Sequence, residues 1–325
     1  MRAILNLPNA ATLAALVATA VGVLGFAGCG DGGGGSASSG VEVAATTTEV
    51  ADLAANVAGD RADVEGILAP NSDPHEYEPR PSDAEAVADA DLILQSGGDL
   101  DLWLDQIVES AGTEAPVVTL IDSVQTIAGE GEGGEPEVDP HWWQDPTNAI
   151  AAVEQIRDSL IEVDPDGAGE YRENAKTYVS RLERLDSRIE ACIERIPADQ
   201  RKLVTSHDAL GYLANRYDME VIGAAIPALT TQAQASSGET ADLVDLIRTE
   251  GVKAVFPEAG VSQQLEDAIA NETGAEIGGV LWADALGPPD SSGATYIDSM
   301  AANAATMVDG LTGGAQSCEI DVGSG

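Results

Sequence analysis

The sequence predicts an α/β protein made of two lobes of parallel sheet flanked by helices, joined by one long helix. From residue 41 onward, short apolar runs alternate with amphipathic segments, a pattern typical of βα units and parallel sheets. An unbroken amphipathic stretch of about thirty residues divides this series in two. At 325 residues the chain is long enough for about two domains of roughly 150 residues each.

The first lobe is expected over residues 41–166, with its strands in the apolar runs and its helices in the amphipathic segments. Strands are expected at 41–46, 64–70, 91–97 and 117–121, and helices up to Val57, from Pro81, over 100–112 and from Pro146. The acidic segment 129–138 is rich in Gly and Glu and has no apolar residue before Val138. We therefore interpret this segment as mobile.

The linking helix is expected over residues 167–197, where apolar residues recur every three or four positions. At 1.5 Å per residue, such a helix would span about 45 Å. The second lobe, residues 198–325, repeats the plan of the first. Its strands are expected at 202–206, 219–225, 252–257 and 277–282, and its helices from His207, over 237–251, over 262–273 and over 296–311.

Residues 1–28 are predicted to be a signal peptide, with positive Arg2 followed by an apolar run over 11–27. The small residues before Cys29 resemble a bacterial lipobox, whose cysteine becomes lipidated, although Phe26 stands where Leu is usual. An ordinary signal peptide with a chance cysteine is the alternative. Residues 29–40 would then be the lipidated cysteine and a Gly/Ser-rich flexible tether of about 20 Å reach.

The formal charge of −41, from 15 basic and 56 acidic residues, excludes partners that are themselves polyanions. We expect no nucleic-acid partner and no attraction to an anionic membrane surface. A highly solvated surface, as in secreted or salt-adapted proteins, explains the acidity without a specific cationic partner. The charge alone does not indicate a function.

Four polar residues are candidate metal ligands, because each follows a predicted strand or lies in the loop beyond one. Ligands of open α/β sheets bind beyond the carboxyl ends of the strands, and each lobe supplies two candidates, which predicts a site in the cleft between lobes. Three imidazoles and a carboxylate can fill a tetrahedral zinc shell. The candidates are His75 in NSDPHEYEP, His141 in VDPHWWQDP, His207 in KLVTSHDALGYL and Asp284 in LWADALG.

Each candidate also has a simpler interpretation. A lone histidine is usually a surface or capping residue, and both His207 and Asp284 could cap helices. Glu258 in FPEAG is a rival carboxylate near the same edge. The joint placement of the four is what favours a metal site.

Taken with Cys29 and the long helix, these motifs resemble the zinc/manganese solute-binding proteins of bacterial ABC importers, solute-binding family 9, over about residues 41–315. The resemblance implies two α/β lobes joined by a rigid helix, a metal site in the cleft and delivery of the ion to an ABC permease. Matched motif by motif, the family's ligands fall on His75, His141, His207 and Asp284. Manganese members carry glutamate where His207 stands, so the resemblance favours Zn²⁺. The acidic segment lacks the histidines that zinc members often carry there.

We therefore expect an extracytoplasmic carrier of Zn²⁺ that is attached to the cell membrane as a lipoprotein and acts as a monomer, with Mn²⁺ as the alternative ion. A zinc hydrolase using Glu258 as base is a second hypothesis, but four protein ligands leave no open position on the metal. An adhesive surface lipoprotein with a structural metal is a third. The aromatic residues Trp142, Trp143 and Tyr77 would either shield the cleft or serve plain packing.

Two cysteines remain if Cys29 is lipidated, and an even pair in an oxidising compartment suggests a disulfide. A bond between Cys192 and Cys318 would attach the acidic C-terminal tail to the long helix. Two free thiols are the alternative.

Replacing Cys29 with Ser should move the protein from the membrane fraction to the soluble fraction, because the acyl chains that hold it would be lost. Cell fractionation and mass spectrometry of the N-terminus measure this. A wild-type protein that is already soluble and carries no lipid would contradict the lipoprotein interpretation.

Overall fold

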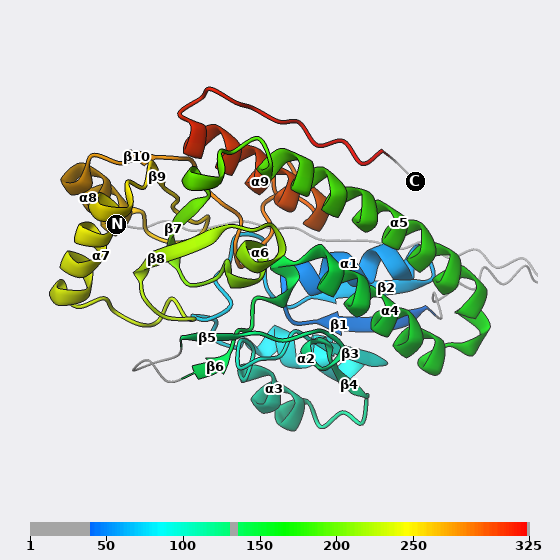
Figure 1. Ribbon diagram of the computed structural model, residues 1–325. Helices are drawn as coiled ribbons and strands as arrows, with labels where there is room; N and C mark the ends of the chain where they lie inside the picture. The colour runs from blue at the N-terminus through cyan, green and yellow to red at the C-terminus, as the bar shows by residue number, and fades with distance from the viewer. Residues whose placement is uncertain (1–39, 131–135, 324–325) are drawn as a thin grey trace, which may run out of the picture. The chain divides into compact units, whose positions relative to one another are not determined.

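Strand β1 (Val41–Ala45) lies inside a parallel sheet with the order β2-β1-β3-β4, which forms the first lobe. The computed structural model describes residues 40–130 and 136–323 (Figure 1). The predicted signal peptide, Cys29 and nearly all of the tether lie outside the described residues. The other elements up to the long helix are α1 (Thr48–Ala58), β2 (Ala62–Gly66), α2 (Pro81–Asp89), β3 (Leu92–Gln95), α3 (Trp103–Ala111), β4 (Val117–Thr119), β5 (Ala128–Glu130), β6 (Pro136–Val138) and α4 (Pro146–Val163).

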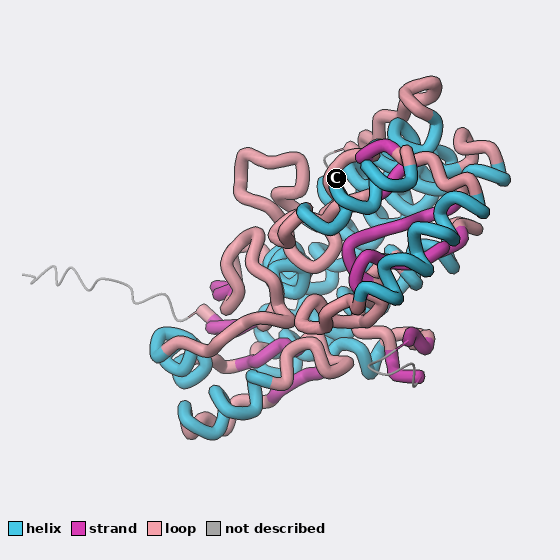
Figure 2. The backbone as a smooth tube through the Cα atoms, turned by 90° about the vertical axis from the view of Figure 1, so that its left-hand side faces the viewer, coloured by secondary structure: helices cyan, strands magenta, loops and turns pink. Residues whose placement is uncertain are grey.

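The second lobe is also built from parallel strands, paired as β7-β8 and β9-β10. An isolated bridge between Thr205 and Phe256 links the two pairs. Helices flank the strands in both lobes (Figure 2). The elements of this lobe are β7 (Lys202–His207), α6 (Gly211–Arg216), β8 (Glu220–Ile226), α7 (Ser237–Glu250), β9 (Ala254–Val255), α8 (Gln264–Thr273), β10 (Glu276–Ile277) and α9 (Tyr296–Thr312). The predicted α/β class with parallel strands and a long helix is confirmed.

The long helix α5 (Ala168–Ile193) packs on α1 and α4 of the first lobe and on α9 of the second (Figure 1). Its 26 residues span about 39 Å at 1.5 Å per residue. The residues predicted to form its apolar face are all buried: Tyr171, Ala175, Tyr178, Leu182, Leu185, Ile189 and Ile193. Burial of that face, rather than intrinsic propensity, stabilises the helix against the core.

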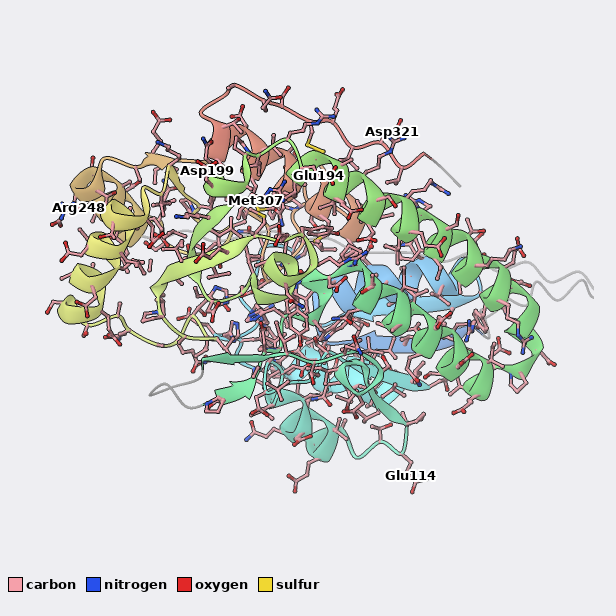
Figure 3. The ribbon with its side chains drawn as sticks, viewed as in Figure 1. Glu114, Glu194, Asp199, Arg248, Met307 and Asp321 are labelled. Carbon is pink, nitrogen blue, oxygen red and sulfur yellow. A yellow bond between two sulfur atoms is a disulfide. The ribbon has the colours of Figure 1, made fainter. Side chains whose placement is uncertain are left out.

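One apolar cluster continues from the first lobe into the second, from Val43 through Leu185 to Leu311. The lobes therefore share a core, and α5 covers it instead of bridging open solvent. Acidic side chains such as Glu114 and Asp321 point outward, whereas Met307 lies inside (Figure 3). The predicted domain limits at residues 41, 167 and 198 stay a prediction.

Several element boundaries differ from the sequence prediction. The strand predicted at 64–70 is β2, which ends at Gly66 where its register with β1 ends. The strand predicted at 277–282 stops at Ile277, because the backbone leaves the extended conformation at Gly279, where φ is +117°. Parallel pairing returns only as an isolated bridge between Glu258 and Leu281. The helix predicted from His207 begins at Gly211 instead.

The acidic segment 129–138 begins and ends in ordered structure rather than forming one mobile loop. Its flanks belong to β5 and β6, which pair as an antiparallel hairpin. Residues 131–135 lie outside the described residues, so the prediction of mobility is untested there. Among the described residues, no helix combines the length and apolar character needed to cross a membrane.

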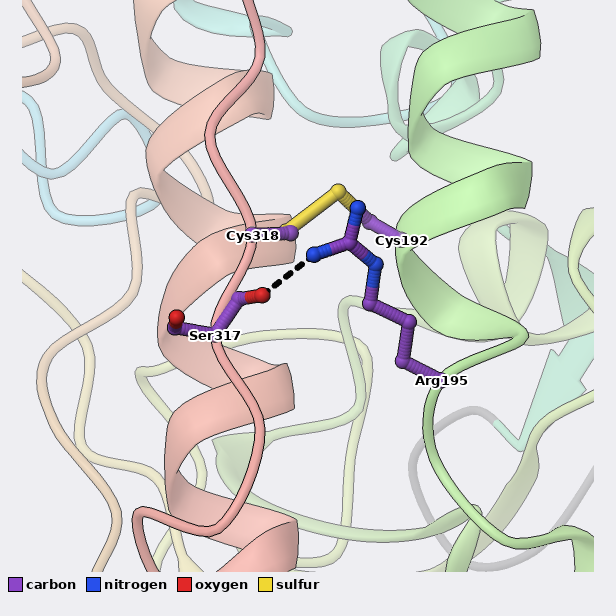
Figure 4. The surroundings of a disulfide bond; sticks show 4 residues. All are labelled: Cys192, Arg195, Ser317 and Cys318. Atoms are coloured by element: carbon purple, nitrogen blue, oxygen red, sulfur yellow. Dashed lines mark hydrogen bonds between the residues drawn. A yellow bond between two sulfur atoms is a disulfide. The ribbon is translucent and has the colours of Figure 1, made fainter.

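The predicted disulfide is present between Cys192 at the end of α5 and Cys318 in the C-terminal tail (Figure 4). The two Cα atoms are 5.7 Å apart, within the usual range for a disulfide. Two arginines of the α5 region also hold the tail: Arg195 donates to the carbonyl of Ser317, and Arg184 Nε donates to the carbonyl of Val322 at 2.9 Å. The tail is thus attached along the long helix.

Replacing Cys192 and Cys318 together with Ser should lower the free energy of unfolding by about 2–4 kcal/mol, since the bond closes a loop of 126 residues in the unfolded chain. Denaturant unfolding of both proteins measures the difference. Thiol counting on the unfolded, unreduced mature domain from residue 40 should find no free thiol. Two titratable thiols would exclude the bond.

Candidate metal centre

Four side chains from distant parts of the chain meet at one point: His75, His141, His207 and Asp284. One possible ligand atom from each lies within 4.8 Å of the others. His75 lies in the loop after β2, His141 precedes a 3₁₀ turn, His207 ends β7, and Asp284 follows β10. The structure therefore brings together all four residues that the sequence analysis selected.

The spacing of the four ligand atoms fits a tetrahedral ion. Nε2 of His207 lies 3.1 Å from Oδ2 of Asp284 and 3.2 Å from Nε2 of His141. Oδ2 of Asp284 also lies 3.4 Å from Nε2 of His75, whereas the other oxygen, Oδ1, lies 3.5 Å from Nε2 of His141. For bonds of roughly 2.0–2.1 Å, the edge of a tetrahedron of ligands is about 3.3–3.4 Å. These four distances lie close to this edge, and the remaining pairs of possible ligand atoms lie within 4.8 Å.

The cluster is buried and contains polar atoms that lack a hydrogen bond. His141 and His207 are 0% exposed and Asp284 is 7% exposed. Nε2 of His75 and both carboxylate oxygens of Asp284 are buried without a hydrogen bond of good geometry. Burying a carboxylate without donors is costly, and a cation bound between these atoms would offset that cost.

Two of the imidazoles are each held by a carboxylate behind the ring. Asp139 Oδ1 lies 2.7 Å from Nδ1 of His141 and accepts its backbone N–H. Glu258 Oε2 lies 2.6 Å from Nδ1 of His207, and Oε1 accepts the backbone N–H of His207 at 3.1 Å. A proton shared on Nδ1 leaves Nε2 of each ring available to bind a metal.

His75 is held differently, through its backbone. Its N–H donates to Asp73 at 2.8 Å, and its carbonyl accepts from the side chain of Gln232. Thr231 donates to the other oxygen of Asp73 at 2.6 Å, so two residues of the second lobe hold this loop. Among the described residues, Asp284 is the sole carboxylate within ion-pair distance of the His75 ring. A cavity of about 250 Å³ borders His75.

The loop that carries Asp284 is anchored to the first lobe. The carbonyl of Ala283 accepts hydrogen bonds from Trp143 Nε1 at 2.8 Å and from the Gln144 amide at 2.7 Å. The N–H of Leu286 donates to Thr48 Oγ1 at 2.7 Å. Asp284 therefore belongs to the second lobe by sequence but is positioned by the first.

The three aromatic residues proposed to shield the cleft have separate positions. Trp143 is buried with its ring centroid 5.5 Å from that of His141, and Trp142 is buried beside it. Trp143 thus packs directly on a ring of the cluster, whereas Trp142 packs on Trp143. Tyr77 instead packs on Trp103 at 4.7 Å and donates to Asp83, so its role is packing.

The charges of the cluster favour a protonated His207 beside an ionised Asp284 when no metal is bound. Burial alone would lower the pKa of His207, but the carboxylates of Asp284 and Glu258 outweigh it and hold the pKa well above its usual value. Burial alone would raise the pKa of Asp284, but the imidazoles of His207 and His141 hold it well below its usual range. A cation that takes Nε2 must displace this proton.

Sequence reasoning identified the four cluster residues but missed the residues that hold them. Asp139 lies in the quoted motif VDPHWWQDP, where an acid two residues before a histidine was a usable signal. Glu258 was considered as a rival ligand or a hydrolytic base. Both of its oxygens contact His207, so neither is free to activate a water.

Comparison with known proteins gives consistent matches along the chain. The sequence model of the family described as "Zinc-uptake complex component A periplasmic" (ZnuA) matches residues 43–310. The chain is 35% identical over 288 residues to the manganese-binding lipoprotein MntA of Halalkalibacterium halodurans, covering 88% of this chain and 94% of the relative. It is 33% identical over 270 residues to the iron-binding protein YfeA of Yersinia pestis, covering 83% and 86%.

Solved structures are similar over the same region. The periplasmic zinc-binding protein TroA from Treponema pallidum superposes with a TM-score of 0.77 at 28% identity, covering 83% of this chain and 98% of that protein. A manganese-bound periplasmic metal-binding protein from Candidatus Liberibacter asiaticus gives a TM-score of 0.75 at 28% identity, with the same coverage. The names of these proteins include zinc, manganese and iron.

Zinc binding to the metal-free protein near neutral pH should release about one proton per ion, because His207 carries a proton that coordination must displace. The apparent affinity should rise with pH until the pH exceeds the raised pKa of His207. Calorimetric titration in two buffers with different ionisation enthalpies counts the protons. An affinity that is independent of pH between about 6 and 8 would contradict this charge distribution.

Proposed function

The chain belongs to the zinc-uptake component A family, the solute-binding components of metal ABC importers, and from this premise we propose that it captures Zn²⁺ and delivers it to an ABC permease. The protein is extracytoplasmic and attached to the membrane, as its periplasmic and lipoprotein relatives are. The ion is the cargo of the protein. We propose His75, His141, His207 and Asp284 as its ligands.

The proposal of Zn²⁺ as the ion rests on the type and spacing of the four possible ligands. The imidazole nitrogens lie 3.1–3.5 Å from an oxygen of Asp284, and Nε2 of His207 lies 3.2 Å from that of His141. All four possible ligand atoms lie within 4.8 Å of one another. Imidazole is a borderline ligand that suits Zn²⁺, whereas Mn²⁺ favours oxygen ligands and higher coordination numbers. The position of His207 is central, because its Nε2 is closest to both Asp284 and His141.

A second candidate is a Mn²⁺ carrier with the same ligands. Relatives named for manganese support it, including two called MntA. The buried site could accept Mn²⁺ if that ion were far more available outside the cell, because availability as well as affinity sets occupancy. Intrinsic affinity still orders Zn²⁺ above Mn²⁺ at a nitrogen-rich site.

Capture and release would involve the four ligands unequally. His141 and His207 are oriented in advance by Asp139 and Glu258, which lowers the entropy lost on binding. His75 borders the cavity and is held mainly through its backbone. We propose that the ion enters past His75 and that this ligand is the first to detach when the permease takes the ion.

Catalysis and adhesion are weaker candidates than transport. A hydrolytic zinc needs an open coordination position and a free base, whereas this site has four protein ligands and Glu258 is bound to His207. The adhesive alternative requires a structural metal that does not exchange while the lobes stay folded. Relatives named as substrate-binding lipoproteins of metal transporters favour exchange.

We propose that attachment to the membrane runs through lipidated Cys29, followed by the Gly/Ser-rich residues 30–40. Two acyl chains suffice for stable anchoring. The mature protein would act as a monomer, so that one chain presents one ion to one permease.

Replacing His75, His141 or His207 singly with Ala should weaken zinc binding at least about a hundredfold, or roughly 2.7 kcal/mol, because each change removes one of four ligands. Asp284→Ala should weaken it less if water takes the place of the carboxylate. Asp99→Asn is a matched control, since Asp99 lines the cavity but is not in the cluster. Unchanged zinc titrations for any two histidine variants would refute the proposed site.

Competition between Zn²⁺ and Mn²⁺ on the metal-free protein tests the choice of ion. The ligand set predicts one Zn²⁺ per chain, which Mn²⁺ at an equal concentration does not displace. Metal analysis of protein purified without chelator gives the ion bound in the cell. Tighter Mn²⁺ binding in the same buffer would overturn the zinc proposal in favour of the second candidate.

A further inference from the structure

Glu258 is a buried carboxylate that contacts the metal cluster without belonging to it. It is 3% exposed and follows β9, in the segment whose Phe256 forms a bridge with Thr205 of β7. Its two oxygens are both used on His207, one on the backbone N–H and one on Nδ1 of the ring. The cluster of possible ligand atoms comprises the other four residues and not Glu258.

The backbone around Glu258 is fixed from two sides. Its N–H donates to Ser206 Oγ at 3.1 Å, and it forms an isolated parallel bridge with Leu281. The N–H of Leu281 donates to the carbonyl of Pro257 at 2.9 Å. Glu258 is therefore held between the strand that ends in His207 and the segment that leads to Asp284, so its carboxylate has a defined position.

A carboxylate behind an imidazole changes how that imidazole binds a metal. It keeps the proton on Nδ1, directs Nε2 to the ion and makes the ring a stronger donor. For His207 this contact is 2.6 Å long, and Nε2 on the far side of the ring lies 3.1 Å from Asp284. The ring is thus fixed at both ends along the line from Glu258 to the cluster.

The same carboxylate disfavours an oxygen ligand at position 207. A glutamate there would place its carboxylate against that of Glu258 in a site closed to water, and two buried carboxylates in contact cannot both be ionised without a large cost. The contact between Asp139 and His141 is local, because the two residues are only two positions apart in the same segment. Glu258 reaches His207 from 51 residues away.

We propose that Glu258 is a positioning residue that sets the metal preference of the site, favouring ions that bind imidazole strongly over Mn²⁺, by holding His207 with Nε2 toward the ion. This inference rests on the proposed function, because it assumes that His207 binds the transported metal. It adds a residue outside the ligand set as the determinant of selectivity.

Replacing Glu258 with Gln tests the inference, because the amide keeps the size of the side chain and removes its charge. Zinc affinity should fall about 10–100-fold, the usual effect of losing such a partner. Manganese affinity should fall less, so that the zinc-to-manganese affinity ratio drops about tenfold. Glu250→Gln is the matched control, since Glu250 pairs with Lys202 at the opposite end of β7, and its ratio should not change.

Nitrogen NMR of the His207 ring in the zinc-loaded protein separates positioning from a merely structural role. Wild type and Glu250→Gln should show the proton on Nδ1 and the metal on Nε2, whereas Glu258→Gln should show a weakened or exchanged Nδ1 proton. If Glu258→Gln does not fold, Glu258→Asp can replace it, because aspartate keeps the charge on a shorter side chain. Its zinc-to-manganese affinity ratio should lie between that of wild type and the tenfold lower value expected for Glu258→Gln. An unchanged ratio in a folded variant would overturn the inference.

A double variant gives an independent test. His207→Glu alone should bind Mn²⁺ poorly because its new carboxylate meets Glu258, and adding Glu258→Gln should strengthen Mn²⁺ binding at least about tenfold by relieving that contact. No gain in the double variant would contradict the inference. A wild-type protein that binds no zinc at all would instead refute the proposed function.

Discussion

The buried carboxylate of Asp284 is the constraint on which the rest of the site depends. Its oxygens are enclosed by three imidazoles and make no hydrogen bond of good geometry. Burying such a charge is costly unless a positive charge lies beside it. Without metal, the carboxylates of Asp284 and Glu258 hold the pKa of His207 well above its usual value and so favour a proton there, and a bound cation would take the place of that proton. The site is therefore arranged to exchange one cation for another, which is what a carrier requires.

The Asp284 carboxylate is held in place by contacts that cross from one lobe to the other. The Asp284 loop is held by Trp143 and Gln144 through the carbonyl of Ala283, and the His75 loop is held by Thr231 of the other lobe through Asp73. The apolar core continues across both lobes, covered by α5. Because packed interfaces move between discrete arrangements, access to the ion is expected to depend on loops such as that of His75 rather than on free motion of the lobes.

Much of this arrangement could be predicted from the sequence, since it depends on local patterns. The apolar spacing of α5 and the position of each cluster residue after a strand or in the loop beyond one can be seen along the chain. The parallel bridges Thr205–Phe256 and Glu258–Leu281 then bring the segments of His207 and Asp284 together. The role of Glu258 could not be predicted, because it contacts a histidine 51 positions away. The role of Ala283 could not be predicted because it acts through its backbone carbonyl, which carries no sequence signal. The early end of β10 could not be predicted either, because the positive φ of Gly279 is a property of the folded backbone.

X-ray absorption spectroscopy of the zinc-loaded protein tests the central claim most directly, because it reports the number and kind of atoms bound to the ion. The geometry around His207 and Asp284 predicts four light ligand atoms at roughly 2.0–2.1 Å, with the multiple-scattering pattern of three imidazoles. A six-coordinate shell of oxygens, or a shell with one imidazole or none, would contradict a site formed by these four residues.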